Sequence, residues 1–489
     1  MLISFGTVAR MRRRANSIDT WLFRFLALVS VATLMCLASC WDLRWMSDDW
    51  CLLASAHTGA WQLEAHHLSF PRRLLFALVI NTNAGPELVR AVAGLCLLVA
   101  NLVLFPGVVC RLYPDWSRLR AHSVGLATLV LSTSLEATIW PAICAYPMLL
   151  CCLHAIARYH LDWLRTQESR WRVASILATC AAMCTWELGV GAIPLVVALS
   201  FGQGRPLRRI GWDLVPHALI AVGYVAVKLI IGSSDVPLRD LVRILGNTTY
   251  TPLLQLSPLP LTHGFLTSVG GAASALAALI IVGAAAFSLG RRGWALLAIP
   301  FALLAPVLLG PGPAQRYLLI TAPWFVLLLW AAALAPHRSW RWGMLGTVIL
   351  AVLAPVHLAT TARTVKDWHR AAAAAERLEE DLTRAASGVE AVVALNVADR
   401  LPGWGPTYNI PIWRNGLPQR MSEMGIEVVA RGITNPPDPE VLGIQLTAPI
   451  VGHEELDAWR RRGVRVLDAR PSWADLRGEA VSAHWVEPR

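Results

Sequence analysis

WLFRFLALVSVATLMCLASCWDLRWMSDDWCLL, residues 21–53, contains the transition that decides the fold of this chain. Residues 21–41 form an apolar run that is long enough to cross the roughly 30 Å hydrocarbon core of a bilayer as a helix. The run ends in a polar segment where two adjacent acids, Asp48 and Asp49, stand among tryptophans. The pattern predicts a membrane-spanning helix followed by an acidic loop at the membrane surface.

The composition of the whole chain is typical of a polytopic membrane protein. Of its 489 residues, 55% are hydrophobic and 15% are charged, with a mean hydropathy of +0.50, whereas a soluble domain carries about 25% charge. The formal charge of +11 does not indicate nucleic-acid binding, because the arginines cluster between apolar runs. The basic N-terminus resembles a signal peptide, but the apolar run after it shows no clear small-residue cleavage site, so we expect it to be retained.

Apolar runs along the chain predict about eleven spans. We expect them at residues 21–41, 88–110, 121–139, 142–158, 173–186, 188–202, 213–232, 265–289, 293–309, 317–335 and 342–361. Residues 173–202 are split into two short helices because a single span would hold Glu187 in mid-membrane, where a charge is expensive. Residues 74–85 are too short to span and predict a helix along the membrane surface.

The arginines predict the orientation of the spans. Loops rich in arginine alternate with loops that are poor in it, which places the N-terminus inside and the C-terminus outside. Beyond the last span, residues 367–387 predict an alanine-rich, solvent-facing helix, and residues 389–397 predict a buried strand. The expected fold class is an all-α polytopic membrane protein, with a transmembrane domain over 1–365 and a juxtamembrane helix and small α/β domain outside the membrane over 366–489.

Ionisable side chains gather on the predicted outer face. They are Asp48, Asp49, Glu64, His66, His67, Arg72, Arg73, Glu136, Glu187 and Arg316, and Tyr317 follows the last of them. Charges in or beside spans are functional hypotheses by default, and their common side strengthens the case for one site.

Each of these residues also has a structural interpretation. Asp48 and Asp49 could cap a short helix. Glu136 could be a helix-end polar group that pairs with an arginine, and Glu187 could be satisfied by neighbouring helix donors. Arg316 could be an interfacial side chain that extends to the membrane surface. The histidines fit loop positions better than metal ligation, and no Cys/His spacing indicates zinc.

The ordered motifs resemble the integral-membrane glycosyltransferases of the GT-C type, and within them bacterial relatives of O-mannosyltransferases and of the lipid A aminoarabinose transferase. The matching motifs are SDDW at 47–50, the surface helix, LEATIW at 135–140, WELGVGAIP at 186–194 and Arg-Tyr-Leu at 316–318. The sequence departs from the pattern at Pro71-Arg72-Arg73, where relatives often carry Arg-Pro, and at Ser132-Thr133, near the place of the family's His-Pro.

The resemblance implies transfer of a sugar from a polyprenyl-phosphate-linked donor to a lipid, glycan or protein acceptor on the outer face of the membrane. Asp48 would be the general base, and Asp49 would orient the acceptor or bind a cation. The phosphate would be neutralised by Arg316, with Arg72 or Arg73 behind it.

The resemblance also assigns Glu136, Glu187 and Tyr317 to substrate binding. It leaves open a divalent metal, for which Asp48 and Asp49 are the candidate ligands.

Two other functions compete with this one. A transporter or flippase would place charged or broken helices near the midplane and show a repeat between halves, whereas here the acids lie at outer ends and no repeat is visible. A polysaccharide polymerase or ligase would favour a large late outer loop with arginine and histidine, for which residues 233–264 are the candidate.

Overall fold

The computed structural model describes residues 5–46, 48–58, 69–131, 135–231, 241–257, 268–309, 315–334, 340–389 and shorter segments of the C-terminal part between 391 and 485. Glu64, His66 and His67 lie outside the described residues, as do the side chains of Asp48 and Arg316.

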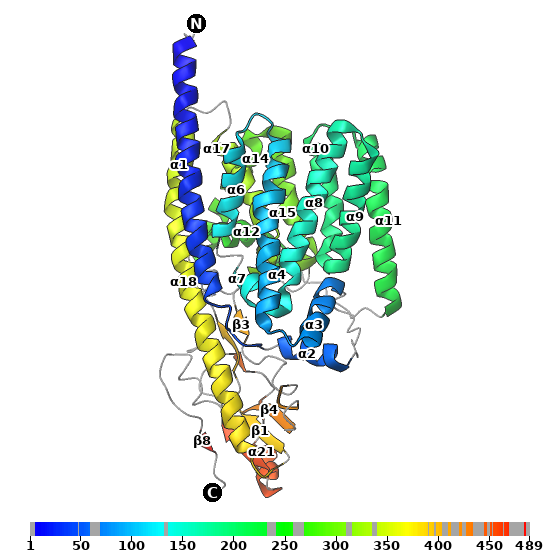
Figure 1. Cartoon of the computed structure of the whole chain (residues 1–489), viewed down its shortest axis with the longest axis vertical. Coiled ribbons are helices and arrows are strands. Elements are labelled where there is room, and N and C mark those ends of the chain that lie inside the picture. Colours follow the sequence, from blue (N-terminus) through cyan, green and yellow to red (C-terminus); the bar gives the residue numbers. More distant parts are fainter. Residues whose placement is uncertain are drawn as a thin grey trace.

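A bundle of helices forms the body of the molecule, and two long helices, α1 and α18, run side by side along one flank (Figure 1). The helices up to residue 231 are α1 (Phe5–Ala38), α2 (Asp48–Thr58), α3 (Phe70–Thr82), α4 (Pro86–Leu98), the π-helical η1 (Val99–Leu104), α5 (Phe105–Leu112), α6 (Arg118–Val130), α7 (Leu135–Ile139), the short 3-10 turn η3 (Pro141–Ile143), α8 (Ala145–Thr166), α9 (Ser169–Thr185), the 3-10 turn η4 (Glu187–Gly191), α10 (Ala192–Gly202) and α11 (Leu207–Ile231). From residue 241 onward they are α12 (Leu241–Leu256), α14 (Val269–Ser288), α15 (Gly290–Leu309), α16 (Gln315–Leu318), α17 (Ala322–Ala333) and α18 (Trp340–Ala385).

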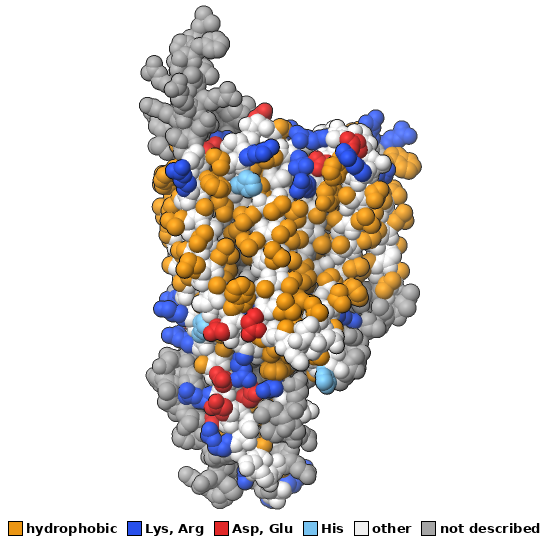
Figure 2. Space-filling view, in the orientation of Figure 1, with side chains coloured by type: hydrophobic (Ala, Val, Ile, Leu, Met, Phe, Trp, Pro, Cys, Tyr) orange, Lys and Arg blue, Asp and Glu red, His pale blue; other side chains and the backbone are white. Residues whose placement is uncertain are grey.

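Six helical stretches among the described residues are long and apolar enough to cross a membrane, and two shorter apolar helices accompany them. The six are Ile18–Ala38, Pro86–Leu112, Pro141–Thr166, Leu207–Val227, Val269–Ser288 and Gly290–Leu308. Large apolar side chains on these helices are exposed, among them Leu28, Leu219 and Ile280. In Figure 2 hydrophobic side chains form a band across the middle of the visible face, with charged side chains above and below it. A surface of this kind is stable against lipid tails, so the chain is an integral membrane protein.

The break predicted near Trp186 and Glu187 is present. Helix α9 ends at Thr185, η4 turns the chain, and α10 follows. Gly189 is required in this turn, because a Cβ atom there would collide with the carbonyl oxygen of Ala182. The turn therefore depends on the close approach of two backbone segments.

Three sequence-based expectations differ from the structure. The helix predicted over 121–139 ends at Val130, and Glu136 lies in the separate helix α7. The loop predicted over 233–264 contains α12, whose Gly246, neighbouring threonines and Pro252 hide the helical pattern. The last span and the charged helix 367–387 form one continuous helix, α18, although Pro355 lies inside it.

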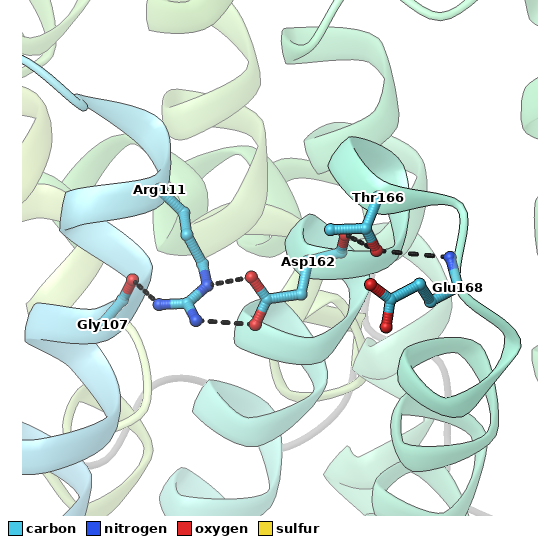
Figure 3. Close-up of polar contacts among 5 residues, drawn as sticks. All are labelled: Gly107, Arg111, Asp162, Thr166 and Glu168. Atoms are coloured by element: carbon cyan, nitrogen blue, oxygen red, sulfur yellow. Dashed lines mark hydrogen bonds and ion pairs between the residues drawn. The ribbon is translucent and has the colours of Figure 1, made fainter.

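The loops between α5 and α6, α8 and α9, α10 and α11, and α14 and α15 lie together at one end of the bundle, here called the basic end (Figure 1). Their arginines hold neighbouring helices together. The Arg111 guanidinium forms a two-bonded ion pair with Asp162, at 2.6 and 2.7 Å, and donates to the Gly107 carbonyl (Figure 3). Arg205, between α10 and α11, donates to the Leu164 carbonyl in the last turn of α8. The grouping of these loops agrees with the sidedness predicted from arginine.

Helices α2, α3 and α7 and the C-terminal strands lie at the opposite end, here called the site end (Figure 1). The strands of the first sheet are β1 (Ala391–Leu395), β4 (Glu427–Ile433), β6 (Ile450–Val451), β7 (Arg465–Asp468) and β8 (His484–Trp485), in the order β6-β4-β1-β7-β8. Strand β1 pairs in parallel with β4 and β7, and α21 (His453–Arg461) packs on β7. A second sheet contains β2 (Ala398–Pro402), β3 (Asn409–Pro411) and β5 (Gln445–Leu446). The strand predicted over 389–397 is therefore present as β1.

Candidate functional site

Asp49 is fully buried at the start of α2. Its Oδ2 atom accepts a hydrogen bond from the backbone N–H of Met46 at 2.9 Å, and the Asp49 N–H donates to the Met46 carbonyl at 3.0 Å. The carboxylate bonds back to an N–H three residues earlier, as the acid of a capping box does. The other carboxylate oxygen, Oδ1, accepts from the N–H of Ala142 at 2.7 Å. Asp49 therefore fastens α2 to η3, which is the structural alternative weighed for it from the sequence.

Arg72, on α3, contacts Ala142, the residue whose N–H is bound by Asp49. Its NH1 atom donates to the Ala142 carbonyl at 2.9 Å, and its guanidinium lies over the Trp186 ring at 5.0 Å from the centroid. Desolvation lowers the pKa of Arg72, and the nearby Glu187 is one of the groups that oppose this shift. The Nε donor of Arg72 is buried and has no hydrogen-bond partner among the described residues. The acid and the cation thus converge on opposite sides of one peptide segment.

An aromatic group lies next to this pair. The Tyr146 ring packs against Trp186, at 5.0 Å between centroids, and against Tyr317 in an edge-to-face arrangement at 5.6 Å. Tyr146 and Trp186 are buried, and Tyr317 belongs to α16, which contacts α7. Because Glu187 directly follows Trp186, η4 brings an acid to the same region. Rings of this kind offer both apolar faces and polar edges to a ligand.

The structure brings most of the predicted site residues to one end of the bundle. Glu136 is buried in α7, which contacts α16. Arg73 follows Arg72 on α3, and burial lowers its pKa. The backbones of Asp48 and Arg316 lie at this end in α2 and α16.

Sequence reasoning missed Arg90, a buried residue on α4. Its guanidinium donates to the carbonyls of Trp41, Leu43 and Arg44 after α1, and its Nε donates to Ile139 at the end of α7 at 2.9 Å. The carbonyls at helix ends have no hydrogen-bond donors within the helix, so Arg90 supplies donors to the carbonyls of two chain segments at once. The signal was available, because Arg90 is a charged residue near the start of an apolar run.

The described residues contain no group of three or more His, Cys, Asp or Glu side chains that could hold a metal ion. Each carboxylate oxygen of Asp49 already accepts a backbone hydrogen bond, which makes Asp49 a poorer ligand than an acid that faces open space. The described part of the proposed acid pair therefore does not fit a divalent metal, and no step below is routed through one.

The chain matches solved structures of ArnT from Cupriavidus metallidurans. The structure in the apo state aligns with a TM-score of 0.53 and 11% sequence identity, over 94% of this chain and 94% of that chain. The structure bound to undecaprenyl phosphate aligns with a TM-score of 0.49 and 12% identity, over 96% of both chains. No protein-family model matches the sequence, and no curated protein matches it.

The first alignment covers nearly the whole length of both proteins, so it includes the bundle, the long flanking helices and the C-terminal strands. It agrees with the GT-C-type resemblance inferred from the ordered motifs. The chain therefore has the fold of ArnT.

Proposed function

We propose that the chain is a membrane glycosyltransferase that moves a sugar from a polyprenyl-phosphate-linked donor to a hydroxyl of a lipid, glycan or protein acceptor. The observation that carries this proposal is the convergence on Ala142 of Asp49, next to the candidate base, and of a buried arginine. The ArnT-like fold supports the same reaction class.

Arg72 has the properties required to bind a lipid phosphate. Arg72 is 8% exposed and is held by Ala142 and Trp186, yet its Nε donor has no hydrogen-bond partner in the described part of the chain. A buried donor without a partner is costly, and an anionic oxygen would satisfy both the donor and the charge. Arginine is suited to this role because its planar guanidinium group can make two parallel charge-assisted hydrogen bonds to phosphate. Arg316 and Arg73 are proposed as further cations for the same group.

The transfer would proceed by direct displacement. The acceptor oxygen attacks the anomeric carbon, and Asp48 takes the hydroxyl proton as general base. The bond between the anomeric carbon and the phosphate oxygen breaks, and the lipid phosphate leaves with its negative charge beside Arg72. Attack from the face opposite the leaving group inverts the anomeric centre. Glu136, Glu187 and Tyr317 are proposed to contact the sugar or the acceptor.

The site end is proposed to face the outside of the cytoplasmic membrane, with the N-terminus inside and the C-terminal strands outside. The support is the concentration of arginines at the basic end, as the positive-inside rule requires. An impermeant thiol reagent should label an Asp48→Cys variant in intact cells, and labelling only after permeabilisation would reverse the orientation.

The test of the reaction is transfer from a labelled polyprenyl-phosphate sugar in membranes. Asp48→Asn and Arg72→Met should each lose activity, whereas the control Asp115→Asn, at an exposed position between α5 and α6, should retain it. Full activity in Asp48→Asn, with the protein inserted at its normal level, would refute the general-base role. Movement of the lipid-linked sugar across the bilayer without a transfer product would favour the flippase alternative.

A further inference from the structure

Among the described residues, Arg420 connects the C-terminal part of the chain to the candidate site. Arg420 places its guanidinium over the ring of Trp50, at 4.5 Å from the centroid. Trp50 is mostly buried in α2 and directly follows Asp49. A cation over an indole face is attracted by the ring and more strongly so where water is excluded. The contact therefore joins the C-terminal part to the helix that begins at the candidate base.

Glu379 on α18 holds this arginine in place. Its Oε1 atom accepts from the Nε of Arg420 at 2.9 Å and pairs with the NH2 at 2.8 Å. Its Oε2 atom pairs with Arg44, in the segment between α1 and α2. The Glu379 side chain is 10% exposed, so both ion pairs are largely shielded from water and are screened little by salt. One carboxylate thus binds the segment before α2 and the C-terminal part at the same time.

Further contacts attach the C-terminal part to α18 and to the main hydrophobic core. Met421, next to Arg420, is fully buried in the main hydrophobic core together with Ile410 of β3. Arg465 of β7 donates to the carbonyls of Ala385 and Ser387, at 2.9 and 2.8 Å, and so satisfies the C-terminal end of α18. The C-terminal strands are therefore packed against α18 at several points, and Arg420 extends from this packed region to α2.

We propose that Arg420 and Glu379 are positioning residues for the acid pair: Glu379 orients Arg420, and Arg420 fixes α2, and with it Asp48, through Trp50. The C-terminal part is then a component of the active site. The kinetic consequence of this inference rests on the proposed function, because Asp48 acts as a base only in the proposed transfer reaction. Its structural consequence, the immobilisation of α2, does not depend on the reaction.

The first measurement is hydrogen exchange in the α2 peptide, residues 48–58, of the purified full chain. Arg420→Ala and Glu379→Gln should each speed exchange there by roughly tenfold, the factor that corresponds to loss of one such contact. Exchange in α8 and α9 should not change. The matched control is Arg384→Ala, which removes an exposed arginine paired with Asp381 on the same helix and should leave α2 unaffected.

The second measurement separates positioning from general destabilisation. In the transfer assay, Arg420→Ala should lower kcat per folded molecule by about tenfold with little change in KM for the donor, and Arg420→Lys should recover part of the loss because it keeps the charge. The double variant Arg420→Ala/Glu379→Gln should have a kcat no lower than that of the more affected single variant, because both changes break the same linkage from Glu379 through Arg420 to Trp50.

Unchanged exchange in α2 in both Arg420→Ala and Arg420→Lys would overturn the inference, whatever the activity. Faster exchange with unaltered kcat would also overturn it, because α2 would then be loosened without any effect on the base. If the wild-type chain transfers no sugar from any polyprenyl-phosphate donor, the proposed function fails, and the exchange measurement still decides whether Arg420 holds α2.

Discussion

Replacing Asp49 with asparagine separates the structural acid from the candidate base. The Asp49 carboxylate is fully buried and accepts backbone hydrogen bonds from Met46 at 2.9 Å and from Ala142 at 2.7 Å. Asparagine keeps one acceptor oxygen and replaces the other with an NH2 group, which would face a backbone donor. One charge-assisted hydrogen bond is lost and one buried N–H is left unsatisfied, so we expect a loss of about 2–4 kcal/mol in the free energy of unfolding.

The expected loss converts into a shift of the unfolding midpoint. At about 2 cal/mol/K per residue, a chain of 489 residues has an unfolding entropy of about 1 kcal/mol/K. Asp49→Asn should therefore unfold about 2–4 °C below the wild type in the same detergent and at the same heating rate. Asp48→Asn, which changes only the proposed base, should keep the wild-type midpoint and lower kcat by about 100-fold or more.

An unchanged midpoint in Asp49→Asn would refute the reasoning, because the two backbone donors would then not depend on this carboxylate. A midpoint in Asp48→Asn as low as that of Asp49→Asn, with normal kcat per folded molecule, would instead assign both acids to the structure. The two variants differ by one residue in position and have the same change in chemistry, so each is the control for the other.

Three further outcomes follow from packing. Arg90→Met should lower stability by about 3–5 kcal/mol, since it leaves the carbonyls after α1 and at the end of α7 without their donor; a midpoint within 1 °C of the wild type would contradict the observed network. Arg111→Ala, Asp162→Ala and the double variant should show a coupling free energy of about 1–3 kcal/mol by thermal unfolding, because the pair is two-bonded and mostly buried. Gly125→Ala should reduce the yield of folded protein in membranes, because its Cβ atom would collide with the Asn101 carbonyl oxygen in η1; a normal yield would show that α6 can move away from η1.

The local signals of the sequence predicted the helical framework. Apolar runs located the helices around 21–41 and 88–110, and the glutamate near Trp186 located the break between α9 and α10. The same signals failed over 233–264, where Gly246 and Pro252 interrupt the pattern of α12. The same signals predicted two helices where the structure has the single helix α18. Hydropathy changes where the helix becomes charged, but the helical hydrogen bonds continue past that point.

The roles of the candidate site residues depend on contacts that the sequence does not contain. Asp48 and Asp49 are neighbours in the sequence, but only the structure shows that the Asp49 carboxylate accepts hydrogen bonds from the backbone N–H groups of Met46 and Ala142. The resemblance named Arg316 first for the phosphate and Arg72 behind it, and only the structure shows that Arg72 is buried with an Nε donor that has no partner among the described residues. These distinctions depend on which backbone groups surround a side chain, and no single-sequence pattern contains that information.

The sequence by itself determined that this chain crosses a membrane, and it predicted that the arginine-rich loops share one side and that the acids and arginines of the candidate site share the other. These properties follow from transfer free energies, which are summed over neighbouring residues and can be evaluated without a fold. The tertiary structure alone decided that Asp49 and Arg72 meet at Ala142, and that Glu379 joins Arg44 to Arg420. The partners in these contacts lie 41 to 335 residues apart, and packing of the bundle is what brings them within hydrogen-bond distance.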